Sequence, residues 1–300
     1  MISRSTIRRG VTLVELLLSL IVTAIVGAAL VRMVLSQARF MDQQEAWRGA
    51  RAVARGGVNR LVSDLRIVEA AGGLTAAVAG GQDFTVQVPY AFGILCTVGA
   101  NTATVSLLPV DSAMYNAPGK SGFAIRADDG TYTYYTANVL STPPAAGAPG
   151  NCTGAAAITT VPTLNGSPAG QVVQVTATAA NFAPVPKVGQ ILFLYRRIRY
   201  QFKNSTMLPG RTGLFRTPLD APGPPEEELA APFANTARVN FYMLNSAVST
   251  STAPATAAAR ANVRGLELVL DGMSERTPGG SAAPKTANVK TSVFFENRPD

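Results

Sequence analysis

The feature that most constrains the fold is an apolar run near the N-terminus, from Val11 to Val31, in which Glu15 is the only charged residue. At a helical rise of 1.5 Å per residue, its about 21 residues reach across a hydrocarbon core of roughly 30 Å. An aspartate at the centre of a membrane helix costs about 2.5–3.5 kcal/mol, and ionisable groups within the bilayer usually serve a function. The run therefore predicts a membrane-spanning helix in which Glu15 needs a partner.

The residues around Glu15 resemble the class III signal of type IV prepilins and type II secretion pseudopilins, in which a glycine and usually a phenylalanine precede Thr-Leu-x-Glu. The chain reads Gly10-Val11-Thr12-Leu13-Val14-Glu15 here. The resemblance implies that prepilin peptidase cuts after Gly10, that the new N-terminus at Val11 is methylated, and that Glu15 pairs with the terminal amine of a neighbouring subunit. Val11 departs from the usual phenylalanine.

Two other interpretations compete with this one. An ordinary secretory signal would be cut near Ala24 to Ala29, but its apolar region runs roughly 7–15 residues and seldom contains a glutamate. A plain membrane anchor would carry Glu15 by chance. The resemblance instead implies a single-pass inner-membrane protein, with its leader in the cytoplasm and its head outside, that joins other minor and major pilin or pseudopilin subunits in a fibre.

Composition limits the chemistry of the chain. Histidine is absent, which removes the commonest general base, the commonest zinc ligand and every Ser-His-Asp or Cys-His arrangement. Only 15% of the residues are charged, and the net charge of +8 includes Arg4, Arg8 and Arg9 of the leader. We therefore expect an extracytoplasmic protein that catalyses no reaction and holds no cofactor or metal.

The two cysteines, Cys96 and Cys152, both lie in the part that would be exported. Loop-like residues flank each of them, which favours one disulfide in an oxidising compartment. This bond would close a loop of about 55 residues and add about 4 kcal/mol in chain-entropy models. Two reduced thiols are the alternative.

Beyond Arg32 the pattern stays helical but becomes amphipathic. Apolar residues recur every seven positions, with two more between them, at Met33, Phe40, Trp47, Ala54, Leu61, Val68, Val58 and Leu65. This pattern predicts one long helix to about residue 72 that packs one face on the rest of the protein. Gly56-Gly57 predicts a kink or loosened turn, and Gly72-Gly73 predicts the end of the helix.

From about residue 82 the pattern changes to the alternation typical of strands. The predicted strands are 84–89, 104–108, 132–140, 172–178, 191–203, 213–216, 237–244, 263–271 and 289–295. Stretches rich in Ala, Pro, Gly and Thr predict long loops at 141–169 and 246–260. We therefore expect an α+β fold, in which the N-terminal helix packs on a head built from antiparallel sheet.

The order of the later strands resembles PilW-type minor pilins and J-type pseudopilins. The matching segments are Tyr195 to Phe202, Gly213 to Arg216, Ala237 to Tyr242, Val263 to Leu268 and Phe295 to Arg298. The resemblance implies a pilin-like lollipop with a leader at 1–10, a membrane helix at 11–31, an amphipathic extension at 32–72 and a head at 73–300. It also implies a minor subunit that primes or caps a type IV pilus or a type II secretion pseudopilus.

One predicted strand combines aromatic side chains with four cations, Arg196, Arg197, Arg199 and Lys203. Such a combination is typical of proteins that bind single-stranded nucleic acid, so capture of extracellular DNA is an alternative function. Strand alternation offers a second explanation, with one solvent-facing side and one packed side. The first side would carry Phe193, Tyr195, Arg197 and Arg199, and the second Leu194, Arg196, Ile198, Tyr200 and Phe202.

Three shorter motifs have simple structural explanations. Gly119-Lys120-Ser121 resembles the end of a phosphate-binding loop, but Met114 stands where that loop needs a glycine. Asp128-Asp129-Gly130 predicts a tight hairpin turn, with a calcium site as the alternative. Glu226-Glu227-Glu228 predicts a solvated acidic loop, with a docking site for a basic partner subunit as the alternative.

Overall fold

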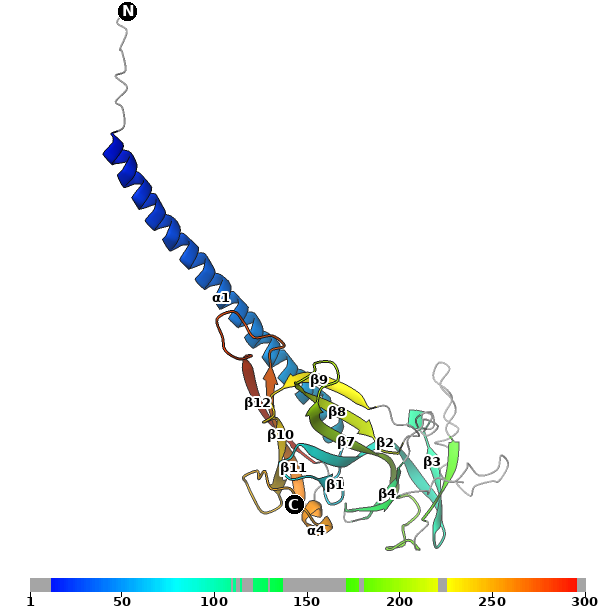
Figure 1. Ribbon diagram of the computed structural model, residues 1–300. Coiled ribbons are helices and arrows are strands. Elements are labelled where there is room, and N and C mark those ends of the chain that lie inside the picture. Colours follow the sequence, from blue (N-terminus) through cyan, green and yellow to red (C-terminus); the bar gives the residue numbers. More distant parts are fainter. Residues whose placement is uncertain are drawn as a thin grey trace, which may run out of the picture.

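The computed structural model of the chain describes residues 12–108, 110–111, 114, 121–128, 130–136, 171–177, 181–220 and 226–295. They form one long N-terminal helix and a large antiparallel sheet (Figure 1). This confirms the predicted α+β class. The leader at 1–10, Val11, Cys152, the motif at 119–120 and the predicted loop at 141–169 lie outside the described residues.

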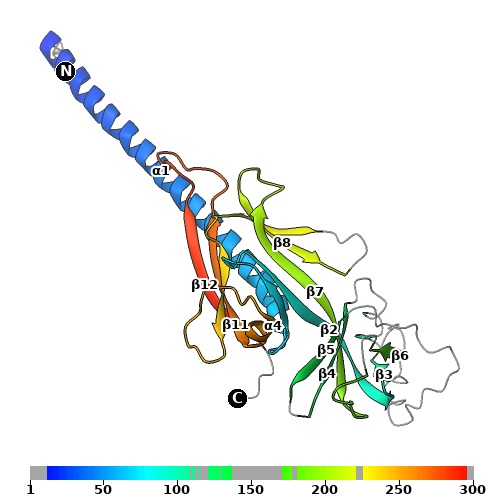
Figure 2. The same ribbon diagram turned by 60° about the horizontal axis from the view of Figure 1, so that its bottom comes forward.

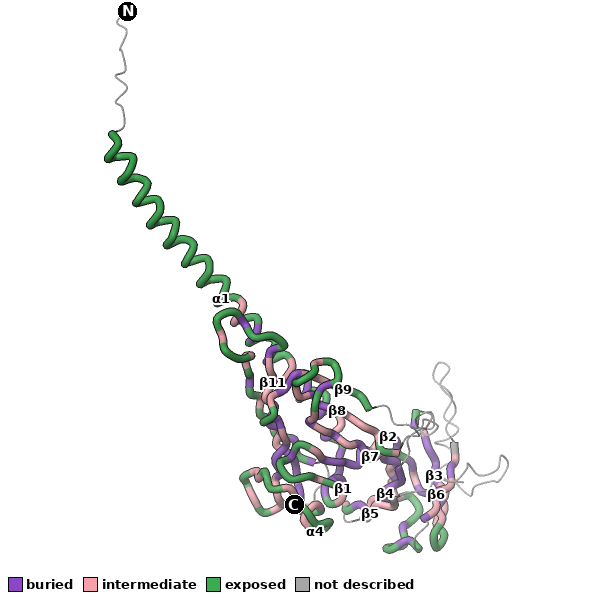
Figure 3. The backbone as a smooth tube through the Cα atoms, in the orientation of Figure 1, coloured by how far each residue is buried: buried purple, intermediate pink, exposed green. Residues whose placement is uncertain are grey.

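Helix α1 (Leu13–Leu65) contains 53 residues and has two different environments along its length. It begins at Thr12, whose Oγ1 accepts a hydrogen bond from the Glu15 amide at 3.3 Å. Every residue from 12 to 41 is exposed, and the first buried residue is Ala46, as the change of colour along the helix shows (Figure 3). The helix is long and apolar enough to cross a membrane by length and composition.

The predicted course of this helix needs three corrections. The helix ends at Leu65, not near residue 72, because the chain turns there and places Val68 in the core with none of its surface exposed. It continues as α-helix through Gly56-Gly57, so the predicted loosened turn is wrong. The predicted buried stripe is correct only for its later members, since Met33, Phe40 and Trp47 precede or flank the contact with the head and are exposed.

Twelve described strands form the sheet, and every pairing between them is antiparallel. Their order along the main path is β10-β11-β9-β8-β7-β2-β3-β6 (Figures 1 and 2). The strands of this path are β2 (Asp83–Val98), β3 (Thr102–Leu107), β6 (Gln171–Thr176), β7 (Ile191–Asn204), β8 (Thr212–Pro218), β9 (Glu227–Phe233), β10 (Arg238–Met243) and β11 (Val263–Met273). Four further strands pair beside it, β1 (Leu74–Ala77), β4 (Gly122–Arg126), β5 (Tyr132–Thr136) and β12 (Thr286–Phe294).

Some of these elements are not among the predicted ones. Strand β9 occupies part of the predicted acidic loop, so Glu227 and Glu228 belong to the sheet and the loop prediction is wrong for them. A short helix, α4 (Ala257–Ala261), begins within the predicted loop at 246–260 and ends one residue beyond it. The hairpin prediction is confirmed, because β4 and β5 pair around a turn in which Gly130 has φ of +84°.

The main hydrophobic core lies between the second half of α1 and the sheet, where the helix contacts β9, β11 and β12. Small residues allow this close approach. A Cβ at Gly272 of β11 would lie 2.9 Å from the amide nitrogen of Ala54, and Ala50 and Ala54 are completely buried. A second apolar cluster lies at the other end of the sheet, around Leu107 and Val173.

Candidate functional site

The first candidate site is the exposed apolar half of α1 with its single carboxylate. Glu15 lies in the first turn, where a negative charge suits the positive end of the helix dipole. Among the described residues, no hydrogen bond or ion pair engages its carboxylate. Gly10 and Val11 lie outside those residues, so the predicted cleavage and methylation stay predictions.

The predicted disulfide has one member within the described residues. Cys96 lies near the end of β2, has 7% of its surface exposed and is disulfide-bonded. Cys152 lies outside the described residues, so the pairing of these two cysteines stays a prediction. The bond holds a strand that contributes to the second apolar cluster.

The four cations predicted for DNA contact all lie on β7, but three of them have carboxylate partners. Arg197 forms a bidentate pair with Asp220, with its Nε 3.1 Å from Oδ1. Arg199 pairs in the same way with Asp83, with its Nε 3.0 Å from Oδ1.

The third pair joins Lys203 to Glu226. The hydrogen bonds that Arg197 donates to Asp220 raise the pKa of Arg197, and those that Arg199 donates to Asp83 raise the pKa of Arg199. The DNA contact stays a prediction, with little unpaired positive charge on this side of the strand.

The remaining cation, Arg196, lies on the opposite side of β7. The predicted alternation is correct for Leu194, Ile198, Tyr200 and Phe202, which are buried on that side. It is wrong for Tyr195, which was expected to face solvent but is completely buried, because the Tyr134 ring packs against it. The Arg196 guanidinium carbon lies 4.2 Å above the centre of the Tyr90 ring. The Nε and Nη2 of Arg196 are buried and have no hydrogen-bond partner among the described residues.

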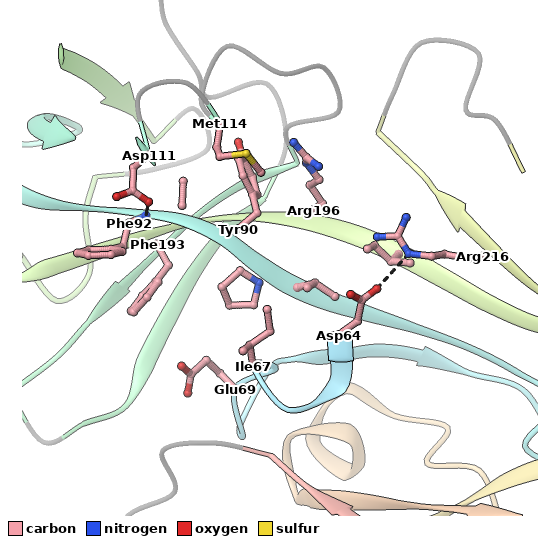
Figure 4. A pocket seen from close by; sticks show the side chains of 14 residues that line it. Asp64, Ile67, Glu69, Tyr90, Phe92, Asp111, Met114, Phe193, Arg196 and Arg216 are labelled. Atoms are coloured by element: carbon pink, nitrogen blue, oxygen red, sulfur yellow. Dashed lines mark hydrogen bonds and ion pairs between the residues drawn. The ribbon is translucent and has the colours of Figure 1, made fainter. Parts of the chain in front are cut away.

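Arg196 and Tyr90 line a cavity of about 530 Å³ between the end of α1, β2 and β7 (Figure 4). This volume lies in the range of small-molecule sites. Most of its wall is apolar, from Ile67, Val88, Pro89, Ala91, Phe92, Met114, Phe193 and Ile198. The polar lining comes from Asp64, Glu69, Tyr90, Asp111, Arg196 and Arg216.

Hydrogen bonds from other parts of the protein hold Asp64 and Asp111 in the cavity wall. Asp64 of α1 accepts hydrogen bonds from the Tyr200 hydroxyl and, at 3.0 Å, from Arg216 Nε. Asp111 accepts one from the Phe92 amide at 3.0 Å, and burial raises the pKa of Asp111. In Figure 4, Asp111 and Glu69 lie on the far side of the cavity from Arg196.

Sequence reasoning missed this cavity, although one signal pointed to it. The alternation of β7 already placed Arg196 on the packed side, away from Arg197 and Arg199. What the sequence did not show is that β2 brings Tyr90 under the guanidinium from more than 100 positions earlier. Within the described ranges, no three metal-binding side chains lie close together.

The fold and these sites define an α+β protein with one exposed apolar helix that continues into its core. Comparison with protein-family models, with curated proteins and with solved structures gives no significant match.

Proposed function

We propose that this chain is a non-enzymatic minor pilin or pseudopilin. In this role prepilin peptidase processes it at the inner membrane, and it helps to prime or cap the assembly of a type IV pilus or a type II secretion pseudopilus. The observation that carries the proposal is the fully exposed apolar half of α1, with Glu15 as its only acidic residue before Asp42. The resemblance of residues 10–15 to the class III signal gives this helix its specific role.

The energetics of the helix support a membrane and then a fibre as its two environments. Burial of apolar surface contributes about 25 cal/mol per Å², so large exposed side chains such as Leu18, Leu20 and Ile25 are strongly disfavoured in water. A bilayer surrounds the apolar side chains with hydrocarbon, which is favourable, but it gives the Glu15 carboxylate no counter-charge. A neighbouring helix that offers a terminal amine satisfies both, which favours lateral assembly.

The first test concerns processing. We expect the full chain, expressed with a prepilin peptidase, to begin at Val11, and without it to begin at Met1. Intact mass and N-terminal sequencing measure this directly. A start near Ala24 to Ala29, or at Met1 in both cases, would overturn the proposal.

The second test concerns Glu15. We expect Glu15→Ala to insert and to be cleaved normally, and its cross-linking to other pilin subunits to fall at least about tenfold, because the amine of the neighbour loses its counter-charge. Thr23→Ala is the matched control, since Thr23 lies on the same helix and donates only to the Ser19 carbonyl. Normal assembly of Glu15→Ala would refute the pairing.

A further inference from the structure

The arginines of β7 show how a carboxylate binds in this protein. In Arg199 the Nε and Nη2 edge faces the two carboxylate oxygens of Asp83, one donor to each oxygen. In Arg197 the same edge faces Asp220. Arginine suits such bidentate contacts because its donors form a planar fork.

Arg196 has this same edge without a carboxylate. Within the part of the chain that the structure describes, its Nε and Nη2 are buried and meet no hydrogen-bond partner. Burying a charged donor without an acceptor costs more than the roughly 1–3 kcal/mol of a neutral one. The contact with the Tyr90 ring offsets part of this cost, since a cation above an aromatic ring is attracted to it. Because both atoms are covered by the protein, the guanidinium has to turn toward the cavity to meet an acceptor, and it then gains a charge-assisted pair of hydrogen bonds.

The residues that line the cavity beside Arg196 indicate the chemical character of the rest of the acceptor. Ile67, Phe92 and Phe193 line it, and about two-fifths of the surface of Ile67 and of Phe92 is exposed. Apolar side chains that stay exposed around a concave wall mark a surface that an apolar group can cover. The acceptor therefore carries an apolar body next to its negative charge.

The acidic side chains limit the acceptor to one charge. Asp111 lies across the cavity from Arg196 (Figure 4), where its carboxylate would repel a second carboxylate of the acceptor. Asp64 does not compete for Arg196, because Arg216 and Tyr200 already bind it. We propose that this cavity is a binding site for a small organic monocarboxylate with an apolar body, held by the Nε and Nη2 edge of Arg196.

The test uses the full chain in a non-ionic detergent and 3-phenylpropanoate as the probe, followed by calorimetric titration against protein-free micelles. We expect saturable binding to one site with a dissociation constant below about 1 mM. The neutral analogue 3-phenylpropanamide should bind at least about tenfold more weakly, because it offers no charge to Arg196.

Arg196→Gln should weaken the binding of 3-phenylpropanoate at least about tenfold. Arg199→Gln is the matched control, since it removes the same charge from the same strand on the opposite side and should leave the affinity within about twofold. Ile67→Trp adds a second variant that keeps every charge and fills the cavity from a partly exposed position, and it should also abolish binding.

Three results would overturn the proposal. These are no saturable binding to the unaltered protein, equal binding of the acid and the amide, or equal losses in Arg196→Gln and Arg199→Gln. If Arg196→Gln does not fold, Ile67→Trp decides, and unchanged affinity in that variant would also overturn the proposal. None of these outcomes depends on whether the chain assembles into a fibre.

Discussion

Single carboxylates hold distant parts of the head together. Glu267 of β11 is one example, because its Oε2 accepts hydrogen bonds from Ser249 Oγ at 2.6 Å and from Asn240 Nδ2 at 2.8 Å. The bond from Ser249 and then that from Asn240 lower the pKa of Glu267 below its ordinary value of 4.5. The Glu267 carboxylate thus connects β11 both to the neighbouring strand β10, through Asn240, and to the segment after β10, through Ser249.

The lowered pKa has a definite effect on stability. The contribution of Glu267 is fully present above pH 4.5 and is lost as the pH falls through the lowered pKa. We expect Glu267→Gln to reduce the free energy of unfolding by about 1 kcal/mol at pH 7 and by much less at pH 3. Urea unfolding of the detergent-solubilised chain at the two pH values measures this. Glu275→Gln, at an exposed position, is the control, and an equal effect of Glu267→Gln at both pH values would contradict the argument.

At the scale of the elements, the contact between α1 and the sheet depends on small residues. Gly57 faces the sheet, where a Cβ would lie 2.9 Å from Cζ of Phe233 and 3.2 Å from Cδ1 of Leu270. Gly56 faces away, and nothing lies within 4 Å of a Cβ placed there. Packing against the sheet therefore requires a glycine at position 57 but not at position 56.

This difference predicts opposite effects of the same substitution. We expect Gly56→Ala to raise the free energy of unfolding by up to about 1 kcal/mol, because alanine favours the helix and meets no neighbour. We expect Gly57→Ala to lower it by about 1–3 kcal/mol, because the methyl group displaces the buried Phe233 ring. Thermal and urea unfolding of both variants decide the matter. A change of the same sign in both would show that the Phe233 contact does not limit the helix.

The sequence predicted elements whose own pattern is strong and missed those that depend on distant partners. The alternation of β7 and the turn at Gly130 are local signals, and both are confirmed except at Tyr195, which is buried on the side expected to face solvent. Strand β9 was missed because its polar start resembles a loop, and Glu228 is held there by donors from Ser205 and Thr206. The cavity was missed because its key contact joins Arg196 of β7 to Tyr90 of β2, which are far apart in the sequence.

At the scale of the whole molecule, α1 divides into a part whose apolar side chains are exposed and a part that the head buries. The division falls between Leu35, which is exposed, and Ala46, where burial begins. Among the described residues, the polar contacts between α1 and the head begin at Asp42, which accepts hydrogen bonds from Arg276 at 3.1 Å and from the Gly279 amide at 2.5 Å.

The position of this division predicts which shortened chains fold. We expect a chain that starts at Ser36 to be soluble and monomeric without detergent, because it loses the exposed apolar run and keeps every contact from Asp42 onward. A chain that starts at Val53 should melt at a lower temperature, because it lacks Ala46 and Ala50. Gel filtration and circular dichroism of both chains measure this. Aggregation of the longer chain would mean that the head needs the first half of α1.

Because α1 is one continuous helix, its geometry fixes how the head is rotated relative to the first half of the helix. Each residue of an α-helix turns the axis by about 100° and advances it by about 1.5 Å. The direction in which the head faces is therefore set by the number of residues between Val31 and Ala46. One inserted residue would rotate the head about the helix axis by about 100°. Seven inserted residues would bring the head back to within about 20° of its original orientation.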